Sequence, residues 1–460
     1  LKNKKVLVVG LARSGVSAVR LLKREAAQVT ITDSADMDKL ADTLSMLDDK
    51  DIRLELGGHN INTFLNSDLI VISPGVPYRS EHLLKAKDKG IPVISEIELA
   101  YNFLKSPVIG ITGTNGKSTV TTLTGELLKA YKKNVFIGGN LGTALTDAVL
   151  ANKKWEQVVA EISSFQLEAI KDFRPKIAVL LNITPDHLDR YDSMEEYVWA
   201  KKRIFENQGR EDFAILNADD PYTAEIMKDI KSEAVLFSRL KRVDRGVYEK
   251  QGEIVTSISG KDEAVIKIDN LKIKGVHNIE NAMASIAASQ LAGCPVSLMR
   301  PVLKGFSGLE HRLELVRVVD GVKYINDSKG TNVGAVVKSL AGFTEPVILI
   351  AGGLDKGSDF TPLREFIKDK VRLLILIGKA REKIEKAVGD LTETLVAASL
   401  EDAVNIASYK AESGDVVLLS PACASFDMFK NFEDRGRVFK EAVNKLTGSK
   451  GQGARVKVGI

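Results

Sequence analysis

One segment constrains the fold more than any other, because a strand, a glycine-rich turn and a helix follow one another directly. The apolar run Val108–Thr112 predicts a buried strand, residues 113–116 a tight turn, and Val120–Tyr131 a helix. Glycines allow backbone N–H groups to close on phosphate oxygens, and the N-terminus of a helix adds partial positive charge. The segment therefore predicts an α/β domain that binds the phosphates of a nucleotide.

This turn is a variant of the strict phosphate-loop pattern, which has Gly where this chain has Ile111. The pattern places Lys117 near the outer phosphates and the Ser118 hydroxyl toward Mg²⁺. A plain turn between a strand and a helix is the alternative interpretation. Lys-Ser after Gly116, between a strand and a helix, favours nucleotide binding.

Strands and helices alternate along nearly the whole chain, which predicts parallel sheets. A chain of 460 residues is too long for one core. We predict three α/β domains: a Rossmann-like domain over residues 1–105, a central phosphate-loop ATPase domain over 106–308, and a Rossmann-like domain over 309–447. Residues 448–460 lack a clear period and are predicted to form a flexible tail. Within the central domain, the alternation over Arg242–Lys274 predicts additional antiparallel strands.

Composition excludes several classes of protein. The net charge of +4 is small, and no basic stripe interleaved with aromatic residues predicts nucleic-acid binding. No apolar run approaches the roughly 20 residues that would cross a bilayer. Cys294 and Cys423 lie far apart without metal-ligand spacing, which favours a reducing compartment. Because a strand pattern begins at the first residues, we expect no secretory segment. We expect a cytoplasmic monomer.

Acidic residues and one histidine follow the next predicted strands. Glu161 ends the strand 157–162, at the edge where α/β sheets bind ligands, and a carboxylate suits Mg²⁺. Its alternative role is to stabilise a helix N-terminus. His187 lies in a loop between Asp186 and Asp189 and is predicted to be functional. Composition alone gives Lys201 no role beyond that of a solvated helix face.

Several motifs resemble a known family. Gly113–Ser118, Glu161–Leu167, Asn182–Asp189, Ala200-Lys201 and His277–Asn281 resemble, in this order, the central domain of the Mur ligases and folylpolyglutamate synthases. Four further motifs resemble the branch of the Mur ligases that adds D-glutamate: Asn326–Asn332, Gly352–Lys356, Ser420–Asp427 and Lys430–Phe432. The resemblance covers essentially the whole chain apart from the tail.

The resemblance implies an ATP-dependent ligase that joins D-glutamate to UDP-N-acetylmuramoyl-L-alanine through an acyl phosphate, in the synthesis of peptidoglycan precursors. The first domain would hold the UDP group, the second ATP and two Mg²⁺ ions, and the third D-glutamate. Lys201 falls on the lysine that the family carbamylates to bind the second Mg²⁺. Another Mur ligase or a folylpolyglutamate synthase is the nearest alternative.

The resemblance also implies individual roles. ATP contacts fall on Gly113, Thr114, Asn115, Gly116, Lys117, Ser118, Thr119, Asn278, Asn281, Arg312 and Asp327. Metal ligands fall on Ser118, Glu161, His187 and Lys201. The catalytic set is Lys117, His187, Lys201 and Lys329. Contacts to the UDP substrate fall on Arg13, Ser14, Ser34, Gly75, Asn140 and His187. D-glutamate contacts are predicted at Thr331, Lys356, Ser425, Phe426 and Phe432; Ser425 has a helix cap as its alternative role.

The first domain departs most from the family pattern. Its loop has Ala12 where a dinucleotide-binding turn has its second glycine, and Asp33 follows the next strand, where such an enzyme binds ribose. Taken alone, this unit indicates a nicotinamide-dependent oxidoreductase. Ser73-Pro74-Gly75 fits the Mur ligases better and favours UDP. A nucleotide-binding regulator without chemistry is the third alternative.

Overall fold

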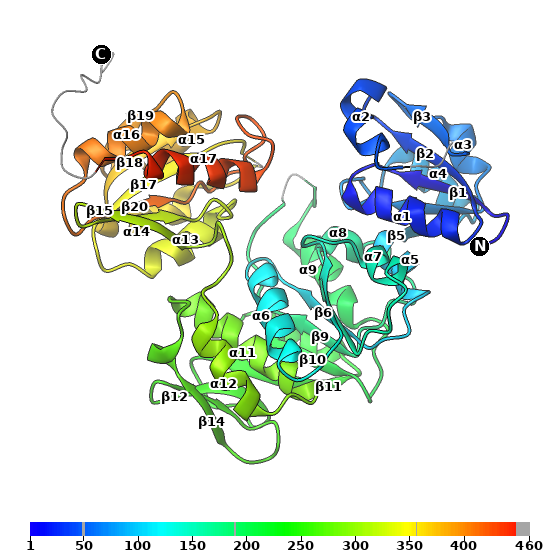
Figure 1. Ribbon diagram of the computed structural model, residues 1–460, viewed down its shortest axis with the longest axis horizontal. Helices are drawn as coiled ribbons and strands as arrows, with labels where there is room; N and C mark the ends of the chain where they lie inside the picture. Colours follow the sequence, from blue (N-terminus) through cyan, green and yellow to red (C-terminus); the bar gives the residue numbers. More distant parts are fainter. Residues whose placement is uncertain (48–50, 188–189, 356, 448–460) are drawn as a thin grey trace. The chain divides into compact units, whose positions relative to one another are not determined.

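The computed structural model describes residues 1–47, 51–187, 190–355 and 357–447, and it contains three sheets (Figure 1). Lys356 and the predicted tail 448–460 lie outside these residues. The chain divides into two compact units. The first unit comprises residues 1–183, 193–271 and 279–306, and the second comprises 184–192, 272–278 and the chain from 307 onward. The three-domain division predicted above, with boundaries after residues 105, 308 and 447, stays a prediction.

The first sheet has five parallel strands in the order β3-β2-β1-β4-β5. Its strands are β1 (Lys5–Val9), β2 (Gln28–Asp33), β3 (Arg53–Leu56), β4 (Leu69–Ile72) and β5 (Val93–Ser95). Its helices are α1 (Arg13–Arg24), α2 (Met37–Leu44), α3 (Ile61–Leu65), α4 (Glu81–Asp88) and α5 (Glu96–Tyr101). Val6 and Val8 pack toward α1, whereas Leu7 and Val9 pack toward α3 and α4. Helices on both faces explain why β1 is apolar from Val6 to Val9.

The second sheet has nine strands in the order β14-β13-β12-β11-β10-β9-β6-β8-β7. The strands are β6 (Val108–Thr112), β7 (Val135–Gly139), β8 (Gln157–Glu161), β9 (Ile177–Leu180), β10 (Phe213–Asn217), β11 (Glu233–Ser238), β12 (Gly246–Lys250), β13 (Glu253–Thr256) and β14 (Glu263–Lys267). The helices are α6 (Lys117–Lys129), α7 (Leu145–Leu150), α8 (Ser164–Leu167), α9 (Met194–Lys202), α10 (Thr223–Ile226), α11 (Val276–Leu291) and α12 (Val296–Gly305). β12, β13 and β14 pair antiparallel, so the prediction for residues 242–274 is confirmed.

The third sheet lies in the second unit and has six strands in the order β15-β16-β20-β17-β18-β19. The strands are β15 (Glu314–Val319), β16 (Val322–Asn326), β17 (Val347–Gly352), β18 (Val371–Ile377), β19 (Glu393–Val396) and β20 (Val416–Leu419). The helices are α13 (Val333–Ala341), α14 (Arg364–Lys370), α15 (Arg381–Val388), α16 (Leu400–Lys410) and α17 (Phe432–Asn444). Among the described strands of this sheet, only β15 pairs antiparallel. The predicted α/β class with three mostly parallel sheets is confirmed.

Candidate functional site

The predicted phosphate loop joins the end of β6 to the start of α6. Gly116 has φ +91°, in the left-handed region that favours glycine. A Cβ at this position would come closer than 3.0 Å to Oδ1 of Asn281, which α11 carries. Gly113 has φ +147°, and a Cβ there would lie 2.9 Å from the Cβ of Leu181, the residue that follows β9. The two glycines let the loop pass between β9 and α11.

Asn182, directly after β9, fixes the shape of this loop. Its side chain accepts a hydrogen bond from the Asn115 N–H at 2.9 Å and donates to the Asn115 carbonyl at 3.0 Å. Its backbone carbonyl accepts from the Thr114 N–H at 2.9 Å. The first amides of a helix have no partner within that helix, so those at the start of α6 are the donors suited to phosphate. Asn182 lies in a recognised motif, but its role was not predicted.

Two lysine ammonium groups converge on the carbonyls of the loop. Lys117 donates to the carbonyls of Gly113 at 2.8 Å and Thr114 at 2.9 Å. Lys201, on α9, donates to the Gly113 carbonyl at 2.9 Å, and its side chain is fully buried. Its ammonium lies 4.5 Å from the ring of Tyr197, whose hydroxyl is 3.1 Å from Oγ1 of Thr114. Lys201 is therefore not on a solvated face.

Glu161 ends β8 beside the loop, because Ile111 of β6 is its neighbour in the sheet. The carboxylate is buried and accepts a hydrogen bond from the Asn140 amide at 2.8 Å. The next helix, α8, is capped by the Ser163 side chain and not by Glu161. Glu161 therefore does not cap α8, and its role as a metal ligand stays a prediction. The buried carboxylate lies next to the phosphate loop, and the Ser118 hydroxyl directly follows this loop in the sequence. Together they are a donor set that fits Mg²⁺.

In the first sheet, the predicted UDP contacts follow the carboxyl ends of β1, β2 and β4. Arg13 donates to the Gly142 carbonyl at 2.6 Å. The Asp33 carboxylate accepts from the N–H groups of Leu11 at 2.7 Å and Ala35 at 2.8 Å. Asp33 therefore holds together the loops after β1 and β2. Ser34 and Gly75 lie in the loops at this same edge of the sheet, and Ser14 lies in the first turn of α1.

The remaining predicted residues of the central domain are divided between the two units. Asn281 belongs to the first unit, whereas Asn278 and His187 belong to the second. Asn278 is buried and donates to the Lys274 carbonyl at 2.8 Å. The His187 ring lies 3.7 Å from the carboxylate of Asp186, and that carboxylate accepts a hydrogen bond from Asn332 at 2.9 Å.

In the second unit, the family motifs meet at the carboxyl ends of the adjacent strands β16, β20 and β17. Asp327 is buried and accepts from the hydroxyls of Ser420 at 2.7 Å and Ser339 at 2.8 Å. Burial raises the pKa of this carboxyl above its ordinary value, against the lowering effect of the Ser420 hydrogen bond and of Arg312. Lys329, two residues further, holds its ammonium 4.5 Å from the Phe432 ring.

Arg435, on α17, connects the motifs over residues 326–332 and 420–427 through hydrogen bonds. Its guanidinium is fully buried and donates to Oγ of Ser328 at 2.9 Å, to the Ser328 carbonyl at 2.8 Å and to the Cys423 carbonyl at 3.2 Å. Burial lowers the pKa of Arg435 to about 10, which still leaves it charged at neutral pH. This residue was not predicted, because sequence does not show which face of α17 points inward.

The predicted D-glutamate contacts differ in exposure. Ser425 is buried, Phe426 is 68% exposed, and Thr331 and Phe432 are half-buried. The Ser425 carbonyl accepts from the N–H groups of Met428 and Phe429, so Ser425 begins a turn and not a helix. The structure therefore gives Ser425 no helix to cap, and its contact with D-glutamate stays a prediction.

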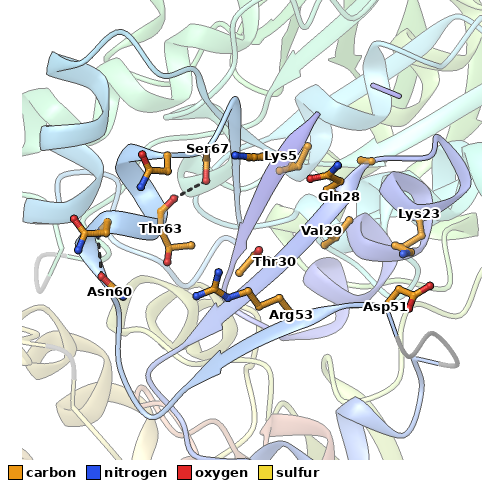
Figure 2. Close-up of a pocket in the computed structure, with 14 residues that line it drawn as sticks. Lys5, Lys23, Gln28, Val29, Thr30, Asp51, Arg53, Asn60, Thr63 and Ser67 are labelled. Carbon is orange, nitrogen blue, oxygen red and sulfur yellow. Dashed lines mark hydrogen bonds between the residues drawn. The ribbon is translucent and has the colours of Figure 1, made fainter. Parts of the chain in front are cut away.

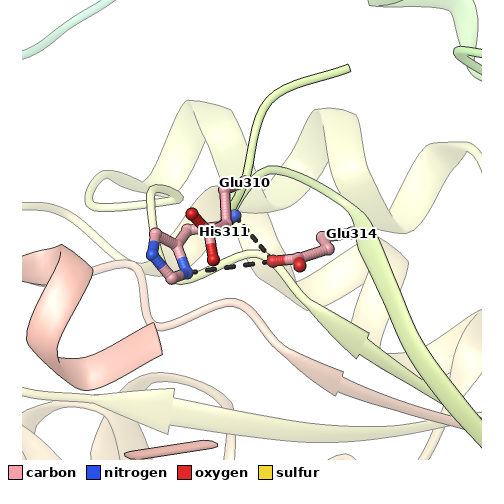
Figure 3. Close-up of side chains that lie close together, drawn as sticks. All are labelled: Glu310, His311 and Glu314. Atoms are coloured by element: carbon pink, nitrogen blue, oxygen red, sulfur yellow. Dashed lines mark hydrogen bonds and ion pairs between the residues drawn. The ribbon is translucent and has the colours of Figure 1, made fainter. Parts of the chain in front are cut away.

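Glu310, His311 and Glu314, which flank Arg312 in the sequence, form a cluster of metal-ligand type. Figure 3 shows the three side chains of this cluster. Lys440 lies against it, and its ammonium contacts Glu310 at 2.7 Å and Glu314 at 2.6 Å. The single lysine charge thus offsets part of the negative charge of the two carboxylates. The buried His311 ring contacts Asn326 at 2.9 Å. We interpret the cluster as a support that holds the chain on both sides of Arg312.

The fold and the site define an α/β phosphate-loop enzyme with a buried lysine and a buried carboxylate beside the loop. Family profiles match the same chain as Mur ligase MurD-like N-terminal domain over residues 4–95, Mur ligase middle domain over 111–289 and Mur ligase glutamate ligase domain over 311–423. The chain belongs to the Mur ligase family.

Relatives and solved structures agree with this assignment. The chain is 52% identical over 451 residues to the UDP-N-acetylmuramoylalanine–D-glutamate ligase of Geotalea daltonii, covering 97% of this chain and 99% of the relative. It is 50% identical to the enzyme of the same name from Geotalea uraniireducens, covering 98% and 100%. A pseudomurein peptide ligase type C from Methanothermus fervidus has a TM-score of 0.62 at 20% identity, covering 96% and 100%, and therefore shares the fold.

Proposed function

We propose that this chain uses ATP to join D-glutamate to UDP-N-acetylmuramoyl-L-alanine, releasing ADP and phosphate. One observation carries the proposal: about half of all residues are identical, over the full length, to relatives that bear the name of this activity. The match includes the third domain, where Mur ligases and folylpolyglutamate synthases are expected to differ. The prediction made from the third-domain motifs agrees with these names.

The reaction needs an activated acyl group. An oxygen of the substrate's alanyl carboxylate attacks the γ-phosphorus of ATP, the bond to the bridging oxygen breaks, and ADP leaves. The uncharged amine of D-glutamate then attacks the carbonyl carbon of the acyl phosphate. A C–N bond forms, the C–O bond to phosphate breaks, and the nitrogen loses a proton. The products are the amide, ADP and phosphate.

The first step brings two anions together, so the protein must supply positive charge. Lys117 would exchange its contacts with the loop carbonyls for the outer phosphates of ATP. The amides at the start of α6 would add donors, and Asn281 would contact the nucleotide. Losing one such preorganised group raises a barrier by about 3–4 kcal/mol, by analogy with oxyanion donors.

Mg²⁺ would be held by Ser118 and Glu161 and would neutralise phosphate charge. For a second ion, His187 and a carbamate on Lys201 would supply ligands. The amine of Lys201 would form the carbamate by adding CO₂ and losing a proton, which turns a cation into an oxygen ligand. Burial of Lys201 beside the loop supports this role.

The motifs at the carboxyl ends of β16, β20 and β17 would receive D-glutamate. Each carboxylate of the amino acid would require its own donors, and each charge-assisted hydrogen bond is worth roughly 1.5–3 kcal/mol. We assign these donors to Thr331, Lys356 and Ser425, with Phe426 and Phe432 as apolar neighbours. Lys329 would lie near the reacting centre, and Arg312 and Asp327 would contact the nucleotide.

Arg13, Ser14, Ser34, Gly75, Asn140 and His187 would contact the UDP substrate. The Asp33 carboxylate already accepts hydrogen bonds from two backbone N–H groups, which supports a structural role for it. A nicotinamide cofactor is therefore not needed to explain this residue. We further propose that the enzyme acts in the cytoplasm as a monomer. Size-exclusion chromatography with light scattering tests the monomer, and a dimer mass at assay concentration would contradict it.

Phosphate release with each reactant omitted in turn tests the proposal. We expect release only when ATP, Mg²⁺, the muramoyl nucleotide and D-glutamate are all present. Preference for L-alanine, L-glutamate or a diamino acid would assign the chain to another branch of the family. Phosphate release unchanged in Lys117→Ala would contradict the role of the loop, and absence of ADP under all conditions would contradict ligase activity.

A further inference from the structure

A second cavity in the first unit is separate from the phosphate loop. It lies where β6 and β8 begin, and its lining includes Pro107 and Glu156, which directly precede these strands. The phosphate loop follows the opposite, carboxyl end of β6. Five residues of strand separate the two ends by about 16 Å. The cavity, which we call the base pocket, has a volume of about 1040 Å³, slightly above the usual range for small-molecule sites.

The lining of the base pocket is strongly cationic. It contains Arg24, Lys105, Lys132, Lys153 and Lys154 but a single acid, Glu156, an excess of four positive charges. Glu156 is already engaged, because its carboxylate accepts from the N–H groups of Lys133 at 2.8 Å and Asn134 at 3.0 Å. The whole 460-residue chain has a net charge of only +4, so this concentration is local.

None of the four lysines of the base pocket forms an ion pair with another residue that the structure describes. Arg24 pairs with the neighbouring Glu25 at 3.2 Å and also donates to the Val149 carbonyl at 2.9 Å, which holds it at the rim. Clustered like charges around a cavity create a positive potential that attracts anions.

An aromatic ring gives the base pocket a fixed flat surface. Trp155 is half-buried, and its indole N–H donates to the Ala148 carbonyl at 2.9 Å. The ring packs edge-on against Phe136 with centroids 5.5 Å apart, and the Lys153 ammonium lies 4.8 Å from the indole ring. Val149 and Leu150 add apolar surface. A rigid indole beside ammonium groups suits a flat ring that carries an anionic group.

A smaller cavity at the first sheet lacks this combination. It has a volume of about 610 Å³, and Figure 2 shows Lys5, Lys23 and Arg53 around it together with Asp51. Arg53 is paired with Glu55 at 3.0 Å. No aromatic side chain occurs among its described lining residues. Its cations are therefore fewer and partly neutralised.

We propose that the base pocket binds a small organic phosphate with a flat ring, which stacks on Trp155 while Lys153, Lys154 and Lys132 contact the phosphate. The site is independent of the ligase reaction proposed above, because no residue assigned to that reaction lines it.

The two tryptophans of the chain make a direct test possible. In Trp199→Phe, Trp155 is the only tryptophan and reports on its own surroundings. The probe is para-nitrophenyl phosphate, whose nitro group quenches indole at short range, and para-nitrobenzyl alcohol is the neutral control. We expect para-nitrophenyl phosphate to quench Trp155 fluorescence in a saturable manner. Para-nitrobenzyl alcohol should show no quenching of comparable affinity. Inorganic tripolyphosphate should compete, since it carries the charge without the ring.

Matched charge variants decide whether the pocket is responsible. Lys153→Gln with Lys154→Gln should weaken binding about tenfold, a modest effect because both side chains are exposed. Lys231→Gln with Lys241→Gln removes the same charge from exposed positions outside the pocket and should leave affinity unchanged. Calorimetric titration of the unmodified chain repeats the measurement if Trp199→Phe lowers stability. Absence of saturation, equal quenching by the alcohol, or equal weakening by the control pair would overturn the proposal.

Discussion

Replacing Gly116 by Ala should inactivate the enzyme, and the structure allows the loss of kcat/KM to be estimated. An L-residue at φ +91° costs about 1–2 kcal/mol in the left-handed region. The added Cβ would also overlap Oδ1 of Asn281, so either that side chain or the loop must move. Displacing one donor from the transferring phosphoryl group costs about 3–4 kcal/mol, which is roughly a 100- to 1000-fold loss of kcat/KM.

Gly252→Ala is the matched control. Gly252 has φ +75° in the turn between β12 and β13, and a Cβ there would meet nothing within 4 Å. This variant carries the backbone cost without the overlap at the loop. Both variants should unfold at similar temperatures, while ADP release with all substrates present should fall only in Gly116→Ala. Activity of Gly116→Ala within about threefold of Gly252→Ala would refute the reasoning, because that difference is below 1 kcal/mol.

Three further predictions follow from buried charges. Arg435→Met should lower the free energy of unfolding by about 3 kcal/mol in urea titrations, because carbonyls that it now satisfies, such as that of Ser328, would be left buried; a loss below 1 kcal/mol would contradict this. Burial raises the pKa of Glu96 from 4.5 to about 7, so the folded state keeps a proton that the unfolded state loses. Stability should therefore fall by about 3 kcal/mol as pH rises from 4.5 to 7, and Glu96→Gln should flatten this dependence; an unchanged slope would show that other groups cause it. Lys201→Ala should reduce phosphate release at least roughly 100-fold, whereas Lys202→Ala, which removes a half-exposed partner of Asp229, should leave it nearly unchanged; equal losses would contradict the special role of Lys201.

Local patterns in the sequence were sufficient for the strands and for the phosphate loop. The run Val108–Thr112 is apolar at every position because β6 lies inside a sheet with both faces covered. The alternation over residues 242–274 indicated additional antiparallel strands, and these are β12, β13 and β14. In both cases the information lies within a few neighbouring residues, so no knowledge of the tertiary structure was needed.

Contacts between distant segments could not be predicted in the same way. Asn182 holds the loop at Asn115, and Tyr197 reaches Thr114, over separations of more than 60 residues. Lys201 and Lys202 are adjacent and chemically identical, yet only Lys201 points into the protein. Periodicity alone does not distinguish them, since α9 has polar residues on several faces. The resemblance to the Mur ligases identified Lys201, and burial then gave a physical reason.

The first domain shows how one sequence pattern can support two ligands. Gly10, Gly15 and Asp33 have the spacing of a dinucleotide-binding unit, and a Cβ at Gly15 would indeed overlap the Gly10 carbonyl. This glycine is therefore required for helix α1 to pack on β1, whatever ligand binds. Asp33 is likewise engaged with the Leu11 amide, so its carboxylate stabilises the loop itself. The pattern thus specifies a turn, and the ligand must be inferred from side chains such as Arg13, which the turn presents.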